Sequence, residues 1–211
     1  MNNLNLKKAA MFGLDARIAL AIFGALSVIS GAALYSAIQS AQAESWRQYF
    51  TEIVKATEAY YLDNGKQIPM LSAGSLSLYT GDIGTNRENL TTWNGPYIQA
   101  SSVTSGYFQD QMTSKIISNA FTKIFLRQGS TWTEMDDTNA DEFCVSGNSD
   151  CYEWITISPG SSSGTANLLA LFNMLDNYID GGDGALDGTV RYNTSSSDFL
   201  MFKGMPHKYT S

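Results

Sequence analysis

The feature that most constrains this chain is a long uncharged stretch near its N-terminus. Ile18–Ile38 contains 21 residues without a charge. As a helix, this stretch spans about 30 Å, the thickness of the hydrocarbon core of a bilayer. Lys7 and Lys8 precede it, so the positive-inside rule predicts a cytoplasmic N-terminus and an exported remainder. Asp15 and Arg17 stand at the edge of the stretch, where a charge needs a partner.

A helical pattern continues beyond the apolar stretch without interruption. Neither glycine nor proline occurs from Ala32 to Asn64. Aromatic and apolar residues then recur at spacings of three and four, as on one face of a helix: Trp46, Tyr49, Phe50, Ile53, Thr57, Tyr60 and Tyr61. The pattern predicts one helix from about residue 14 to 63, roughly 75 Å long, which Gly65 terminates.

Three interpretations of this segment compete. Ala41–Ala43 forms an A-x-A site, which would suit a cleaved signal peptide and a secreted hydrolase. The apolar stretch is longer than the usual 7–15 residues of such peptides, however, and cleavage there would divide a continuous helical pattern. A plain single-span anchor, carrying a periplasmic domain that binds a ligand or calcium, explains the length. It does not explain Asp15, Arg17 or the amphipathic continuation.

The whole layout resembles that of type IV pilins and type II secretion pseudopilins. A short basic leader, an apolar stretch with an acid at its fifth place and a long half-amphipathic helix are typical of this family. The resemblance implies a leader over 1–10 that prepilin peptidase removes between Ala10 and Met11, followed by N-methylation of Met11. It further implies a filament-core helix over 11–40, its amphipathic continuation over 41–64 and a head domain over 65–211. Ala10 departs from the usual glycine and Asp15 from the usual glutamate.

The resemblance also assigns a role in subunit assembly to Asp15 and Arg17. In the family, the acid pairs with the free amino terminus of a neighbouring subunit, here the α-amine of Met11. Arg17 of a neighbour is a second candidate partner, and simple snorkelling near the headgroups is the alternative for both charges. The expected partners are other pilin-like subunits, prepilin peptidase, an assembly platform and the inner membrane. The head would lie in the periplasm before assembly into a filament.

After Gly65 the sequence is typical of strands and turns, and it predicts a small antiparallel sheet with long loops. The expected fold is therefore α+β, with the long helix packed on the sheet. The predicted strands are Lys123–Gln128, Phe143–Val145, Glu153–Ile157, Thr189–Tyr192 and Phe199–Phe202. Apolar residues at helical spacing predict a second helix over Thr165–Ile179, capped by Thr165.

Two short motifs extend the resemblance to the family. The first, an aromatic helix end followed by D-N-G-x-x-x-P, consists of Tyr60, Tyr61, Asp63, Gly65 and Pro69. The second, a G-P-Y segment entering the sheet, consists of Trp93, Gly95, Pro96, Tyr97 and Ile98. Both motifs are typical of turns, because glycine ends a helix and proline fixes the backbone in an extended conformation after it.

The two cysteines, Cys144 and Cys151, predict a disulfide that closes a small loop. They are separated by six residues that include Gly, Asn and Ser, in a chain with an export-type segment. Two reduced cysteines in a cytosolic protein are the alternative. The spacing does not fit a zinc site.

A stretch rich in aspartate and glycine follows the second predicted helix. Asp176, Asp180, Asp183 and Asp187 alternate with glycines, and hard oxygen ligands on a flexible loop suit Ca²⁺. The EF-hand pattern fits only in part, since Tyr178 stands where the third ligand belongs. Some pseudopilins hold calcium in a loop near the end of the domain. A helix end followed by a hairpin turn is the alternative and the favoured interpretation.

Charge and motifs argue against two other classes of function. The net charge is −7, and residues 44–211 account for −9, which repels nucleic acid. The only histidine, His207, is expected in an exposed tail, and the sequence contains no H-E-x-x-H, P-loop or G-x-S-x-G motif. We therefore expect neither an enzyme nor a nucleic-acid-binding protein.

Overall fold

The computed structural model describes residues 3–72, 76–130, 132, 144, 150–160, 165–193 and 199–208, with the side chains of residues 3–12 and 14 left aside. The chain divides into two compact units, Met1–Gln42 and Ala43–Ser211. Helix α1 (Asn3–Asn64) supplies most of the first unit and the N-terminal helix of the second. It begins well before the predicted residue 14.

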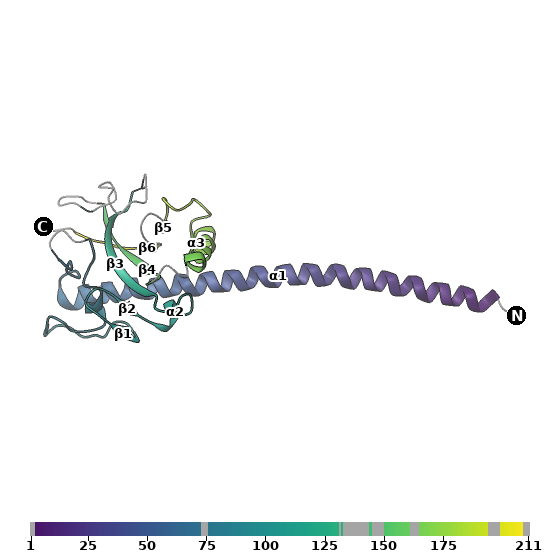
Figure 1. Ribbon diagram of the computed structural model, residues 1–211, viewed down its shortest axis with the longest axis horizontal. Helices are drawn as coiled ribbons and strands as arrows, with labels where there is room; N and C mark the ends of the chain where they lie inside the picture. Colours follow the sequence, from purple (N-terminus) through teal and green to yellow (C-terminus); the bar gives the residue numbers. More distant parts are fainter. Residues whose placement is uncertain are drawn as a thin grey trace. The chain divides into compact units, whose positions relative to one another are not determined.

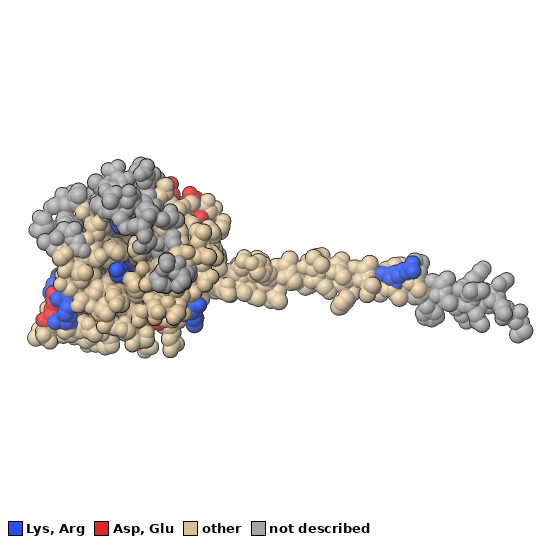
Figure 2. All heavy atoms as spheres, in the orientation of Figure 1, with Lys and Arg blue, Asp and Glu red and all other residues tan. Residues whose placement is uncertain are grey.

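In the first unit, α1 is exposed on every side. Among its large aliphatic residues, Leu20 is 74% and Val28 is 73% exposed. Figure 2 shows uniformly uncharged side chains along this stretch, beyond the basic residue near its start. The helix is long and apolar enough to cross a membrane, a property that a signal sequence near an N-terminus shares.

The second unit is built on a six-stranded antiparallel sheet, whose strands are labelled in Figure 1. The strand order is β1-β2-β3-β4-β6-β5. The strands are β1 (Ser102–Val103), β2 (Phe108–Gln109), β3 (Phe121–Gln128), β4 (Cys151–Ser158), β5 (Val190–Asn193) and β6 (Phe199–Pro206). Three further elements complete the unit: the 3₁₀-helix η1 (Thr80–Ile83), the short helix α2 (Gln111–Ser114) and helix α3 (Thr165–Ile179). The α+β fold, with the long helix packed on the sheet, is as predicted.

Both long helices pack on the same face of the sheet. From α1, the buried residues are Ala43, Trp46, Phe50, Ile53, Ala56, Thr57 and Tyr60. The ring of Phe50 stacks on that of Phe202 in β6, with centroids 4.8 Å apart. From α3, Leu168, Leu171, Phe172 and Leu175 enter the same core. The predicted amphipathic face is confirmed except at Tyr61, which is 43% exposed although its neighbour Tyr60 is buried.

A second, smaller hydrophobic cluster lies on the opposite face of the sheet. Trp154 contacts Trp132, and Met201 completes the cluster. Neighbouring residues of a strand point to opposite faces, so Trp154 belongs to this cluster while Ile155 belongs to the helix side. Both faces of β4 are therefore covered, which explains why six of its eight residues in succession, Glu153–Ser158, are buried.

Most predicted elements are present, with shifted ends. Helix α3 has the predicted bounds, while β3, β4 and β6 are longer than predicted and β5 lies one residue later. The prediction missed β1, β2, η1 and α2, which are only two to four residues long. The predicted strand Phe143–Val145 lies largely outside the described residues, and the proposed cap at Thr165 follows a segment that also lies outside them.

The predicted end of α1 is confirmed. Gly65 has a φ of +64°, and its N–H donates to the carbonyl of Tyr61 at 2.8 Å. Glycine adopts this left-handed conformation without the steric penalty of a Cβ. The chain therefore leaves the helix at the residue that the sequence indicates.

Candidate functional site

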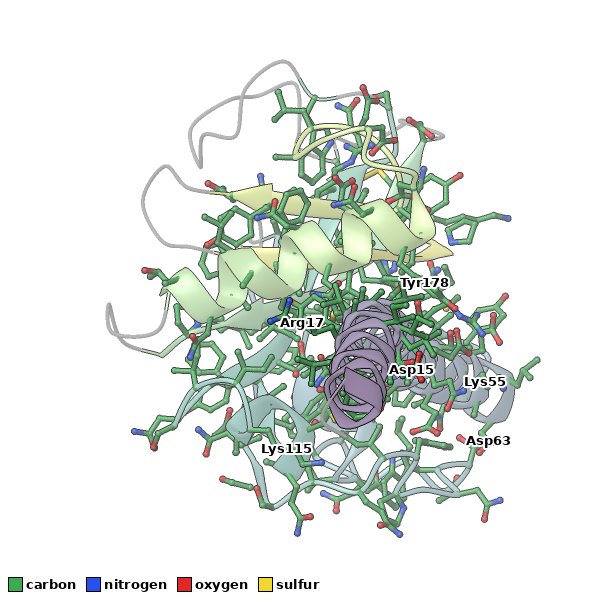
Figure 3. All side chains as sticks on the ribbon, turned by 90° about the vertical axis from the view of Figure 1, so that its right-hand side faces the viewer. Asp15, Arg17, Lys55, Asp63, Lys115 and Tyr178 are labelled. Atoms are coloured by element: carbon green, nitrogen blue, oxygen red, sulfur yellow. A yellow bond between two sulfur atoms is a disulfide. The ribbon has the colours of Figure 1, made fainter. Side chains whose placement is uncertain are left out.

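Asp15 and Arg17 lie on opposite sides of α1 at the start of its uncharged stretch. Two residues along an α-helix correspond to a rotation of about 200°, and Figure 3 shows the two labelled side chains pointing away from each other. Both are exposed, and neither has an ion pair or hydrogen bond among the described residues. Their charges therefore cannot compensate each other within one chain. At the predicted cleavage site, Ala10 and Met11 are helical, while their side chains lie outside the description.

The aspartate-rich stretch forms a tight connection between α3 and β5. Carboxylate oxygens of Asp176, Asp180 and Asp183 lie within 4.8 Å of one another. Asp180 Oδ2 accepts hydrogen bonds from the backbone N–H groups of Thr189 (2.9 Å) and Val190 (2.7 Å). Asp180 thus fixes the start of β5, as expected for a turn-forming aspartate.

Glycine is required where this connection folds back on itself. Gly188 has a φ of +73°, and a Cβ there would lie 2.7 Å from carboxylate oxygens of both Asp180 and Asp183. Only a residue without a side chain lets the backbone pass so close to two carboxylates.

Electrostatic repulsion in the connection is visible at Asp183. Desolvation raises the pKa of its carboxyl, and the negative charges of Asp180 and Asp176 raise it further. Three converging carboxylates of this kind have the donor chemistry that Ca²⁺ prefers. Asp187, the fourth predicted ligand, is not part of the three-residue group. The calcium site therefore stays a prediction on three residues, and the turn function of Asp180 is established by its hydrogen bonds.

The predicted disulfide is present. Cys144 is bonded to Cys151, the first residue of β4, and both are buried. Because Cys151 belongs to an inner strand of the sheet, the bond ties Cys144 to the core. Neither cysteine is left as a free thiol.

The prediction of an exposed His207 is wrong. Its side chain is only 8% exposed, and Nδ1 lies 3.0 Å from Oε1 of Glu153, itself 2% exposed. The backbone N–H of His207 donates to the carbonyl of Cys151 at 2.8 Å, which extends the β4–β6 pairing past the last strand residue. Sequence reasoning missed this pair because nothing in the sequence relates β4 to the C-terminal tail.

The two motifs that follow α1 meet in space. Tyr97 Oη donates to Asp63 Oδ2 at 2.8 Å, which joins the D-N-G turn to the G-P-Y segment. The ring of Tyr97 also packs edge-on against Tyr60 (6.1 Å) and Trp93 (5.6 Å). The motifs therefore form one structural unit at the end of α1.

A groove of about 990 Å³ runs between α1 and the segment 96–112. Its lining is mainly apolar and includes Ile53, Ala56, Tyr97, Val103 and Phe108. At one end, Tyr49 Oη donates to Asp110 Oδ2 (2.7 Å), and burial together with the Asp110 charge holds the pKa of Tyr49 well above its usual value. The groove had no signal in the sequence, because its walls come from distant segments.

These features define a class: an α+β domain, stabilised by a disulfide, that follows a helix able to cross a membrane. Comparisons of the chain with models of protein families, with curated proteins and with solved structures returned no match.

Proposed function

We propose that this chain is a pilin-like structural subunit, which assembles through its N-terminal helix into a type IV pilus or a type II secretion pseudopilus. In this proposal prepilin peptidase removes residues 1–10 and the subunit waits in the inner membrane with its head domain in the periplasm. An assembly platform then transfers it into a filament, where the apolar helices of many copies exclude water from one another.

The observation that carries the proposal is the change of character along α1. Through Ile38 the helix is apolar and exposed on every side, and from Ala43 one face is buried in the head domain. The exposed part requires lipid or other helices around it, because apolar surface is unfavourable in water. An ordinary anchor needs no amphipathic continuation that forms the core of the following domain.

Two further observations support the proposal. The D-N-G and G-P-Y motifs, which carry part of the resemblance, pack on each other through Asp63 and Tyr97. Asp15 and Arg17 have no partner in the described part of their own chain, as expected for charges that pair between subunits. A secreted hydrolase offers no role for these charges, and a plain anchor offers only snorkelling near the headgroups.

Replacing Asp15 tests the proposal. In cells that lack the native chain, Asp15→Ala should insert into the membrane at the normal level and reduce the amount of sheared or secreted filament by at least about tenfold, the effect of losing a close charge pair. Glu58→Ala is the matched control, because Glu58 is also an exposed acid of α1 without a described ion pair. Normal filament yield from Asp15→Ala would contradict the role of Asp15, and absence of filaments from the native chain would contradict the function.

A further inference from the structure

We infer that α1 has two complementary faces, and that each copy presents one of them to the opposite face of a second, parallel copy. The inference rests on the proposed function, and it names the contact by which the helices associate. One face, called here the glycine face, contains Arg17, Gly24 and Gly31. The other, called here the aliphatic face, contains Asp15, Ile22 and Ile29.

Helix geometry places these residues in two rows. Residues seven apart lie about 20° short of two full turns, so Arg17, Gly24 and Gly31 share one side. Asp15, Ile22 and Ile29 form a second row with the same spacing. The rows differ by two positions, about 200°, and therefore lie on opposite sides of the helix, as the labelled Asp15 and Arg17 show in Figure 3.

No contact in the described part of the chain explains the two glycines. A Cβ added at Gly24 or Gly31 would meet nothing within 4 Å, so no internal contact requires a missing side chain there. Each glycine inside a helix costs about 1 kcal/mol relative to alanine. Close approach of another helix provides the reason, because small residues let helix backbones approach closely.

The aliphatic face carries large side chains that fit the space left beside the glycines. Ile22 is 57% and Ile29 is 66% exposed, and neither has a buried surface to pack on within its unit. Isoleucine side chains that project toward glycines restore the contacts that a glycine face lacks. The two faces are therefore complementary in shape.

One axial offset satisfies every pair at once. If a second helix is shifted by two residues, about 3 Å along the axis, its Asp15 lies level with Arg17 of the first. The same shift places its Ile22 level with Gly24 and its Ile29 level with Gly31. The two charges at the edge of the membrane-length stretch then compensate each other between chains, which removes the penalty of an unpaired charge.

Such a contact does not produce a closed dimer. It joins different faces of the two copies, so each copy keeps one free face of each kind for further copies. A heterologous contact of this sort generates rings or open helical filaments rather than dimers. It also distinguishes this chain from an arrangement in which Asp15 pairs only with an amino terminus.

A charge exchange tests the pairing in the full-length chain. Asp15→Arg and Arg17→Asp, expressed singly in place of the native chain, should each lower the assembled fraction by at least about tenfold. The double variant, which exchanges the two charges, should return it to within about threefold of the native level, because the pair is reconstituted. Glu58→Arg, with the same change in net charge as Asp15→Arg, should have no effect. A double variant as impaired as the single ones would overturn the pairing.

Cysteine cross-linking tests the contact independently of the charges. The double variant Ile22→Cys with Gly24→Cys should give a ladder of disulfide-linked oligomers in membranes, because each chain then offers both partners of the contact. Either substitution alone should stay monomeric, and Phe23→Cys with Ser30→Cys, about a quarter turn from both faces, is the control. Dimers from a single substitution without a ladder from the pair would indicate a symmetric contact and overturn the inference. If the native chain assembles while both tests fail, only the inference is lost; if the native chain does not assemble, the proposed function is lost with it.

Discussion

Glu153 and His207 form the most buried acid–base contact among the described residues. Oε1 of Glu153 faces His207, while Oε2 is buried with no hydrogen-bond partner in the described part of the chain. A buried carboxylate is tolerated only when a neighbour compensates it. The C-terminal tail therefore contributes to the stability of the sheet, because His207 is the hydrogen-bond partner of the buried Glu153 in β4.

His207→Ala should lower the free energy of unfolding by about 3–5 kcal/mol, the usual effect of removing one partner of a buried pair. Adding Glu153→Gln to the same chain should recover part of the loss, because the group left without a partner is then neutral. Denaturant unfolding of the full chain in detergent, followed by tryptophan fluorescence, measures both. A double variant less stable than His207→Ala alone would contradict this explanation.

Among the elements, the connection between α3 and β5 combines a structural role with the predicted calcium site. Asp180 holds the first residues of the strand through two backbone hydrogen bonds, whereas Asp183 is exposed and is not required for that geometry. The two roles can thus be separated by changing Asp183 alone. Because the pKa of Asp183 is raised above its ordinary 3.8 in the folded chain, its ionisation weakens the fold as the pH rises through and beyond this value.

If the connection binds calcium, a hundredfold excess over Kd should stabilise the fold by about 2.7 kcal/mol. For a domain of this size the melting temperature should rise by roughly 5–10 °C. Asp183→Asn should abolish the rise, and in EDTA it should leave the protein at least as stable as the native chain. Asp187→Asn, outside the three-residue group, should retain the rise. A melting temperature that responds to neither calcium nor EDTA would leave the connection as a turn only.

The elements also show which parts of the fold the sequence could predict. The long helix, α3 and the four longer strands carry strong periodic patterns, and Gly65 marks a helix end that needs a left-handed residue. The short elements between residues 80 and 114 are held by contacts with α1 and β3, such as the hydrogen bond from Tyr49 to Asp110, and so have little local signal. For the same reason the groove beside α1 and the contact of His207 could not be predicted. The carboxylate group was predicted because its members are close in sequence.

At the scale of the whole molecule, the charges and the apolar surface are separated along the chain. Residues 44–211 carry a net charge of −9, whereas Ile18–Ile38 carries none. A net charge of one sign makes the domains repel one another, so in the proposed filament the association of copies would depend on the N-terminal helices. Within the part of α1 whose side chains are described, Asp15 and Arg17 are the only charged residues on the N-terminal side of the apolar stretch.

The N-terminus of the mature protein tests the central proposal most directly. Mass spectrometry of the chain purified from membranes should find Met11 as the first residue, with its α-amine methylated, because prepilin peptidase acts before assembly. An N-terminus at Glu44 would identify residues 1–43 as a signal peptide and the remainder as a secreted protein. Retention of Met1 would identify a plain membrane anchor. Either of these results would contradict the proposal that this chain is a pilin-like subunit.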